Sequence, residues 1–166
     1  MHGRVDVQVG TLSKAIGVLG GYVAGSRALV EFLYHRARPF LFSTSHPPAV
    51  TAACLAALDV LETEPRWIEQ LWDNTRFFKA GLERLGFNTG GSESPITPVI
   101  VGEAATAARM SDALFAKGVF AQSIGFPTVA RDKARLRTIV SATHTKDDLQ
   151  YALDMFGTVG RELGVI

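Results

Sequence analysis

The sequence predicts an α/β protein in which the end of a larger α/β domain is followed by a small α+β domain. Near the start, two short strand patterns flank a glycine-rich loop and lead into three helical segments. Gly, Ser, Thr and Pro then dominate residues 88–98, which is typical of a domain boundary. Beyond that segment the predicted elements are shorter and alternate between strand and helix. We therefore expect residues 1–87 and residues 88–166 to form separate domains.

Composition and charge are those of an ordinary globular protein. Of the 166 residues, 47% are hydrophobic, and 17 basic residues nearly balance 16 acidic ones. No basic block indicates a nucleic acid or a membrane surface as partner, and the apolar runs are too short to span a bilayer. We see no Cys, His and Asp spacing that predicts a metal site. The single cysteine, Cys54, excludes an internal disulfide, fits a cytoplasmic location, and lies on an apolar helical stripe that predicts a core residue.

The first predicted strand leads into a segment with the chemistry to bind an anion. Residues 5–9 alternate valine with polar side chains, which indicates a strand ending at Gly10. Thr11, Ser13 and Lys14 follow at once, and further glycines after them allow tight turns and close approach to a ligand. Hydroxyls and backbone N–H groups can hold a phosphate, and a desolvated lysine amine can attack a carbonyl. A lone lysine is more often a solvated surface charge, so the spacing alone leaves both readings open.

Four further elements are predicted before the boundary. Residues 21–25 indicate a short strand, and residues 27–36 indicate a helix for which Ser26 is a suitable N-cap. Residues 49–62 and residues 66–85 carry apolar side chains at helical spacing, so both are expected to be helices with one buried face.

The segment between the first two predicted helices is expected to be extended. Residues 38–48 are bounded by prolines, and an aromatic-rich run is followed by hydroxyls that include Ser43 and Thr44. This is either a strand with its turn or a second contact to a phosphate. His46 lies beside the hydroxyls, and a structural role is favoured for it, as for His144 further on.

The second half alternates strands and helices. The expected elements are a strand at 96–101, a helix at 105–117, strands at 119–124 and 135–141, and a helix at 146–163. Pro98 favours either an edge position for its strand or a place at the strand start, because proline cannot donate to a neighbouring strand. Thr145 is expected to cap the last helix, with Asp148 three residues on as a variant of the capping box.

Several segments closely resemble the α-oxoamine synthases, which are pyridoxal-phosphate (PLP) acyltransferases of the aspartate-aminotransferase fold. The resemblance covers essentially the whole chain. Its clearest segments are 11–15, 20–22, 38–43, 96–99, 135–137 and 141–145. It implies the C-terminal part of a PLP fold-type I large domain followed by a small α+β domain. In that family the matching lysine lies past the middle of a chain more than twice this long, so we expect a C-terminal fragment.

The resemblance implies roles for the hydroxyls and the lysine. Lys14 would bind PLP covalently and, once freed, act as general base at the amino-acid Cα. Thr11 would contact the cofactor phosphate, with Ser13 beside it. Ser43 and Thr44 match a phosphate contact that dimers of the family donate to the partner subunit's cofactor, which implies a homodimer with shared sites.

Arg137 matches the family residue that pairs with the carboxylate of the amino acid. Its planar guanidinium suits two oxygens at once. A structural salt bridge is the alternative. Alternation puts Arg135 on the same face of the strand, so the residues alone do not decide which of the two reaches a substrate.

The segments look closest to the glycine C-acetyltransferase branch, which condenses glycine with acetyl-CoA to 2-amino-3-oxobutyrate and CoA. A branch that joins alanine to a pimeloyl thioester in biotin synthesis is the near alternative. A non-catalytic dimerisation module and a transaminase are further alternatives. The family's aspartate at the pyridinium nitrogen and its ring-stacking residue match no segment here, so we expect this chain to be inactive alone.

Overall fold

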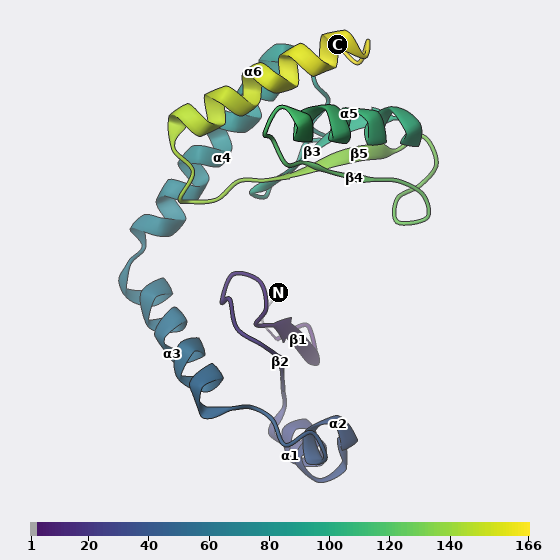
Figure 1. Cartoon of the computed structure of the whole chain (residues 1–166). Coiled ribbons are helices and arrows are strands. Elements are labelled where there is room, and N and C mark those ends of the chain that lie inside the picture. The colour runs from purple at the N-terminus through teal and green to yellow at the C-terminus, as the bar shows by residue number, and fades with distance from the viewer. Residues whose placement is uncertain (1–2) are drawn as a thin grey trace. The chain divides into compact units, whose positions relative to one another are not determined.

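The computed structural model describes residues 3–166, which divide after Pro65 into two compact units (Figure 1). The predicted division after residue 87 stays a prediction, because packing units need not coincide with the domains of a family. The elements of the first unit are β1 (Val7–Thr11), β2 (Gly21–Gly25), α1 (Arg27–Arg36), α2 (Arg38–Leu41) and α3 (Pro48–Thr63). Those of the second are α4 (Arg66–Leu85), β3 (Ile96–Gly102), α5 (Ala104–Ala116), β4 (Gln122–Ile124), β5 (Ala134–Ile139) and α6 (Lys146–Glu162).

The first unit is an antiparallel hairpin followed by helices. Strands β1 and β2 pair from Val7 opposite Gly25 to Thr11 opposite Gly21. Ser26 caps α1 as expected, since its hydroxyl accepts from the Leu29 N–H at 3.3 Å. No residue from 3 to 65 is buried, so this unit has no core of its own among the residues that the structure describes. The buried face expected for residues 49–62 and the core position expected for Cys54 are therefore wrong for this unit, in which Cys54 is only half-buried.

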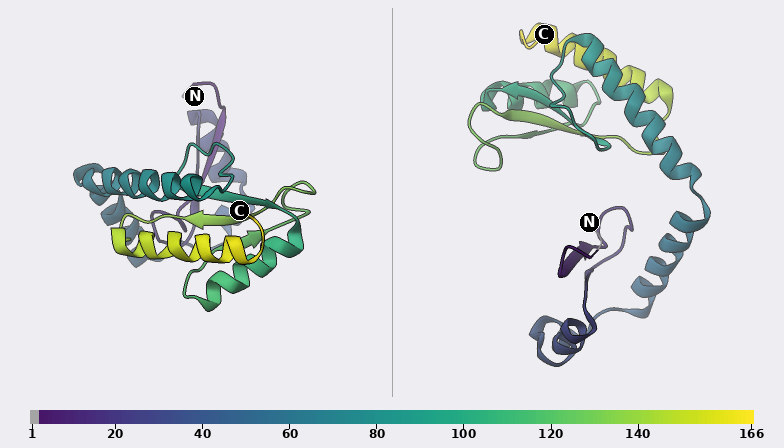
Figure 2. Two further views of the ribbon diagram at one scale, coloured as in Figure 1. Left: turned by 90° about the horizontal axis from the view of Figure 1, so that it is seen from above. Right: turned by 180° about the vertical axis from the view of Figure 1, so that it is seen from behind.

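The second unit packs its helices against a three-stranded antiparallel sheet of order β3-β5-β4 (Figures 1 and 2). Helix α5 contacts all three strands, and α6 contacts both α4 and α5. Strand β3 is an edge strand, which confirms the expectation from Pro98. Strand β5 is central, so both of its edges are hydrogen-bonded.

One hydrophobic core fills the second unit. Phe156 lies at its centre with 1% of its surface exposed, and its ring meets those of Phe78 and Phe87 edge-on at 6.0 and 5.9 Å. The helices α4 and α6 approach closely at Gly81, where an added Cβ would overlap the side chain of Leu153. The other fully buried side chains of largest volume are Leu82, Met110, Leu114, Leu136, Val99, Val159 and Thr97.

Three elements differ from the sequence-based expectation. Residues 38–48 do not stay extended: Arg38–Leu41 form the short helix α2, because Pro39 occupies its first turn, where a missing N–H costs nothing. The first strand begins at Val7 and continues through Gly10, which pairs with Tyr22 instead of ending the strand. A side chain at Gly10 would overlap the Tyr22 ring, which explains the glycine.

The predicted strand at 119–124 is shorter than expected and begins only at Gln122. The residues before it close helix α5 instead. Gly118 adopts a φ of 81°, and the N–H of Val119 donates to the Leu114 carbonyl at 2.9 Å. Because these backbone groups satisfy the end of the helix, they are not available to the sheet.

Thr145 caps α6 in the predicted capping box. Its hydroxyl accepts from the Asp148 N–H at 3.1 Å, and the Asp148 carboxylate accepts from the Thr145 N–H at 2.9 Å. The Thr145 hydroxyl also donates to this carboxylate at 2.7 Å, and that hydrogen bond, together with the one from the Thr145 N–H, holds the pKa of Asp148 below its ordinary value of 3.8. A lowered pKa means that the stabilisation is present above pH 3.8 and is lost as the pH falls through the lowered value.

Substituting Thr145→Ala is expected to lower the free energy of unfolding of the second unit by about 1 kcal/mol, because the Asp148 N–H loses its acceptor and the Asp148 carboxylate loses the Thr145 hydroxyl. Denaturation in urea at neutral pH measures this. Thr158→Ala is the matched control. Thr158 lies inside the same helix, bonded to the Asp154 carbonyl at 2.9 Å, and alanine is the better helix former there. Equal destabilisation by both substitutions would contradict the capping role.

Candidate functional site

The lysine segment is a loop that the β1-β2 hairpin holds at both ends. The N–H of Leu12 donates to the Gly20 carbonyl at 2.9 Å, and the N–H of Val18 donates to the Leu12 carbonyl at 3.0 Å. Within the loop, the N–H of Gly17 donates to the Lys14 carbonyl at 3.0 Å. Lys14 therefore lies in a closed loop whose entry and exit strands are paired.

The three predicted residues of this loop contact one another in series. The Thr11 and Ser13 hydroxyls lie 2.9 Å apart, and the Thr11 hydroxyl also accepts from the Ser13 N–H at 3.3 Å. The Lys14 Nζ donates to the Ser13 hydroxyl at 3.3 Å. All three side chains are exposed. The loop thus presents an amine and two hydroxyls at one place, as a ligand with an anionic group and a carbonyl requires.

The second predicted segment lies within the same unit. The Ser43 and Ser45 hydroxyls are 2.8 Å apart, and the Thr44 hydroxyl donates to the Ser43 carbonyl at 2.7 Å. Both Ser43 and Thr44 are exposed, so their hydroxyls can reach a bound group.

His46 connects the second segment to the lysine loop. Gly20 has a φ of 106°, and a Cβ added there would overlap the His46 ring. The glycine therefore lets the histidine lie directly against the end of the loop. The sequence favoured a structural role for His46 but did not predict this contact. The Gly20-Gly21 pair is the sequence feature from which the contact could have been predicted.

An apolar cleft of about 610 Å³ opens beside the hairpin in the first unit. The residues that line it include Val9, Tyr22, Leu33, Tyr34, Phe40 and His46. Neither Lys14 nor the predicted hydroxyls belong to its lining. The cleft and the polar loop are thus separate features that share only the hairpin and His46.

Arg137 and Arg135 lie on one face of β5, as the alternation predicted. The residues between and beyond them, Leu136 and Thr138, are buried on the other face. The Nη2 of Arg137 donates to the Oε1 of Gln122 at 2.9 Å across the pair of strands β4 and β5. Sequence reasoning missed Gln122, which only the strand register places opposite Arg137.

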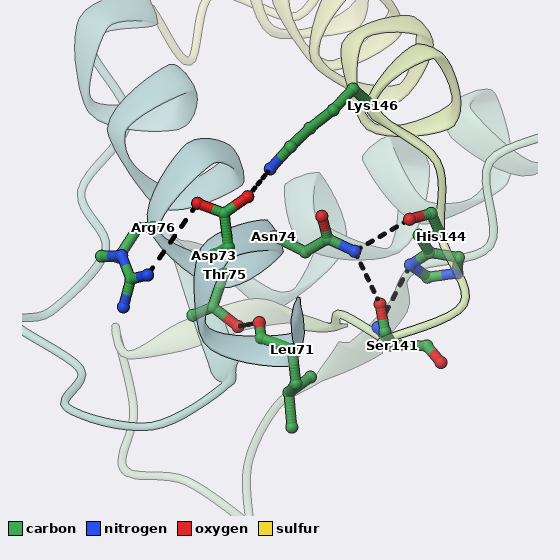
Figure 3. Close-up of polar contacts among 8 residues, drawn as sticks. All are labelled: Leu71, Asp73, Asn74, Thr75, Arg76, Ser141, His144 and Lys146. Carbon is green, nitrogen blue, oxygen red and sulfur yellow. Dashed lines mark hydrogen bonds and ion pairs between the residues drawn. The ribbon is translucent and has the colours of Figure 1, made fainter. Parts of the chain in front are cut away.

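His144 has a structural role in the second unit (Figure 3). Its Nδ1 accepts from the Ser141 N–H at 3.2 Å and so holds the turn before α6. Asn74 of α4 has 2% of its surface exposed, and its Nδ2 donates to the carbonyls of Ser141 at 3.1 Å and His144 at 2.8 Å. The buried amide ties this turn to α4, a contact that sequence reasoning also missed.

An ion pair lies next to that contact. The Nζ of Lys146 is 2.6 Å from Asp73, and both side chains are partly exposed (Figure 3). The hydrogen bond from Lys146 holds the pKa of Asp73 below its ordinary value of 3.8, with its charge adding to the effect. The pair links α4 to the first turn of α6 and has no place in the predicted chemistry.

Within residues 3–166, no group of three or more His, Cys, Asp or Glu side chains is arranged to hold a metal ion. Over the same residues, no helix combines the length and the apolar character needed to cross a membrane.

The chain belongs to the aminotransferase class I and II family, whose model matches residues 1–156. Two relatives indicate which members of this family the chain resembles. The 8-amino-7-oxononanoate synthase of Symbiobacterium thermophilum is 66% identical over all 166 residues, and 8-amino-7-oxononanoate synthase 1 of Bacillus subtilis is 58% identical over the same length. The chain spans 42% of the length of each of these two relatives.

Two solved structures that resemble the chain agree with this family assignment. The structure of SPT with a PLP internal aldimine is 34% identical, with a TM-score of 0.91 over 99% of this chain and 42% of that chain. The 8-amino-7-oxononanoate synthase of Francisella tularensis is 27% identical, with a TM-score of 0.81 over 95% of this chain and 46% of that chain.

These findings confirm the predicted resemblance to the α-oxoamine synthases and the predicted aminotransferase fold, and the small α+β domain at the C-terminus stays a prediction. They favour a different branch from the one we first expected. The relatives above are named 8-amino-7-oxononanoate synthases, not glycine C-acetyltransferases.

Substituting Gly20→Ala is expected to disorder the lysine loop, because the new methyl group would overlap His46 and the backbone would keep an unfavourable φ of 106°. Gly17→Ala is the matched control. It has a φ of 73° but no atom within 4 Å of the added Cβ, so it tests the backbone strain alone. Limited proteolysis within residues 12–20 measures the opening of the loop.

The double substitution Gly20→Ala with His46→Ala is expected to restore part of the resistance to cleavage, because it removes the overlap and leaves only the backbone strain. Equal cleavage of Gly17→Ala and Gly20→Ala would show that the contact with His46 does not matter.

Proposed function

We propose that this chain acts within a PLP-dependent acyltransferase of the 8-amino-7-oxononanoate synthase type, which joins alanine to a pimeloyl thioester. The observation that carries the proposal is the identity of 66% with the S. thermophilum enzyme over every residue of the chain. At that level of identity the acyltransferase chemistry is far better supported than transamination or a purely structural module.

The residues of the lysine loop fit the cofactor. An amine is required to hold the aldehyde carbon of PLP, and Lys14 presents its Nζ beside the hydroxyls of Ser13 and Thr11. Hydroxyls suit the cofactor phosphate, which accepts hydrogen bonds. When bound, PLP supplies an electron sink that stabilises negative charge at the amino-acid Cα. The loop is exposed, so a cofactor could reach it without rearrangement of a core.

The remaining roles follow from the chemistry that each side chain offers. The Lys14 Nζ is assigned as the base that takes a proton from the amino-acid Cα. Arg137 is assigned to the substrate carboxylate, because a guanidinium can donate two parallel hydrogen bonds to it. Ser43 and Thr44 are assigned to the phosphate in the partner subunit of a homodimer. Their exposure is compatible with contact to a second chain.

The condensation of glycine with acetyl-CoA is the second candidate. The resemblance of the sequence to that branch favoured it, and the two reactions share the cofactor and the amino-acid carboxylate. The names of the relatives support it less well than the pimeloyl reaction.

Treating the purified chain with PLP and then borohydride is expected to attach the cofactor to Lys14 in preference to the four other lysines. The reason is the Ser13 and Thr11 hydroxyls beside its amine, which can retain the phosphate. Mass spectrometry of the digested protein locates the adduct. Thr11→Ala with Ser13→Ala should reduce labelling at Lys14 and leave surface labelling unchanged. Label spread evenly over Lys79, Lys117, Lys133 and Lys146 would contradict a preformed half-site.

The substrates are tested in a chimera, in which these 166 residues replace the matching 42% of the S. thermophilum relative. We expect the chimera to release thiol from a pimeloyl thioester with alanine at least about tenfold faster than from acetyl-CoA with glycine, a difference of about 1.4 kcal/mol in activation free energy. Lys14→Ala should abolish both reactions. A preference for glycine with acetyl-CoA would instead support the second candidate.

A further inference from the structure

We propose that Gln122 is a positioning residue, which holds the guanidinium of Arg137 in place for the carboxylate of the amino-acid substrate. The inference rests on the proposed function, because it takes Arg137 as the residue that binds this carboxylate. Neither the sequence pattern nor the family resemblance assigns any role to Gln122.

The strand register brings the two side chains together. Gln122 of β4 is directly opposite Arg137 of β5, so both side chains project from the same face of the sheet. The Oε1 of Gln122 accepts from the Nη2 of Arg137 at 2.9 Å. On the other side, Arg137 is opposite Pro98 of β3, which has no polar side chain to offer. Within the sheet, Gln122 is therefore the side chain that can fix this guanidinium.

Arg135 provides a contrast on the same face. Its cross-strand neighbours are Ile100 and Ile124, which offer no acceptor. Its Nε donates to the Lys133 carbonyl at 3.0 Å, two residues back along the chain. The Arg135 side chain thus bonds to the backbone of its own chain segment, whereas the Arg137 side chain bonds to a side chain on the neighbouring strand β4. Of the two arginines, only Arg137 thus has a cross-strand side-chain partner that could position its guanidinium for a carboxylate.

A neutral acceptor is the suitable partner for a substrate-binding arginine. The amide oxygen of Gln122 occupies one N–H, and a guanidinium has five, so enough remain for two parallel hydrogen bonds to a carboxylate. Because the amide is neutral, this hydrogen bond does not offset the positive charge of Arg137. A carboxylate at position 122 would form a charge-assisted pair with Arg137 and would compete with the substrate.

Fixing the side chain before the substrate arrives lowers the cost of binding. An arginine has many rotamers, and immobilising such a side chain on binding weakens affinity unless the order already exists. Removing the Gln122 amide should therefore weaken binding of the amino acid roughly two- to tenfold, which corresponds to the usual cost for one side chain. The acyl donor does not share this contact, so its KM should not change.

The experiment compares Gln122→Ala and Gln122→Glu in the chimera described above. Steady-state kinetics give kcat and the KM for each substrate, and calorimetric titration gives the Kd for alanine. We expect Gln122→Ala to raise the KM and Kd for alanine about two- to tenfold with little change in kcat. Gln122→Glu should raise both by more than about tenfold, because its charge neutralises Arg137.

Gln150→Ala is the matched control. Gln150 is also an exposed glutamine with one side-chain hydrogen bond, to Asp154 at 2.9 Å, but it lies on α6. It should leave the KM and Kd for alanine unchanged. A fall in kcat and a rise in both KM values together with a lower Tm in Gln122→Ala would reveal a merely structural role and overturn the proposal.

The outcomes separate this inference from the proposed function. If the unsubstituted chimera condenses alanine and Gln122→Ala binds alanine equally well, the positioning role is wrong and the proposed function stands. If the unsubstituted chimera does not bind alanine at all, the proposed function fails and the inference fails with it.

Discussion

The second unit depends on the alternation of side chains along β5. Leu136 and Thr138 are buried on one face, and Arg135 and Arg137 lie on the other. Because β5 is the central strand, hydrogen bonds on both edges fix its register. A slip by one residue would bury an arginine and expose a leucine, which the core would not tolerate. Burial of the core and placement of the guanidinium are therefore consequences of the same register.

The lysine loop is held in a different way. No residue from 3 to 65 is buried, so packing in a core cannot position Lys14. Its loop is closed by the hydrogen bonds between Leu12, Val18 and Gly20, and by the close contact of His46 with Gly20. A segment that relies on a few exposed hydrogen bonds opens at low free-energy cost. The lysine loop and the arginines of β5 thus differ in how firmly the described chain holds them.

Most helices were predictable because each carries its own signals. The helix at Arg66–Leu85 matches the expectation at both ends, since its apolar stripe and the following glycine are local features. Thr145 and Asp148 likewise predicted where α6 begins, because together they form a local capping pattern. The four residues of α2 were not predictable, because Pro39 and the phenylalanines that follow it fit an extended segment equally well.

Contacts between residues that lie far apart in the chain could not be predicted from the sequence. Gln122 is 15 residues from Arg137, and Asn74 is 70 residues from His144. Local patterns carry no information about such pairs, because the pairs depend on strand register and helix packing. The family resemblance supplied the candidates Lys14 and Arg137, but it could not supply the side chains that orient them.

The sequence motifs also could not decide between the two branches of the family, the one that transfers acetyl groups and the one that transfers pimeloyl groups. The candidate residues Thr11, Ser13, Lys14, Ser43, Thr44 and Arg137 are assigned to the cofactor or to the amino-acid carboxylate. Glycine and alanine both carry that carboxylate, and both reactions use the same cofactor. The acyl donor, which distinguishes acetyl from pimeloyl transfer, is not assigned to any of these side chains. Motifs that contain these residues therefore identify the family but not the branch. The evidence for the branch is the sequence identity over the whole chain.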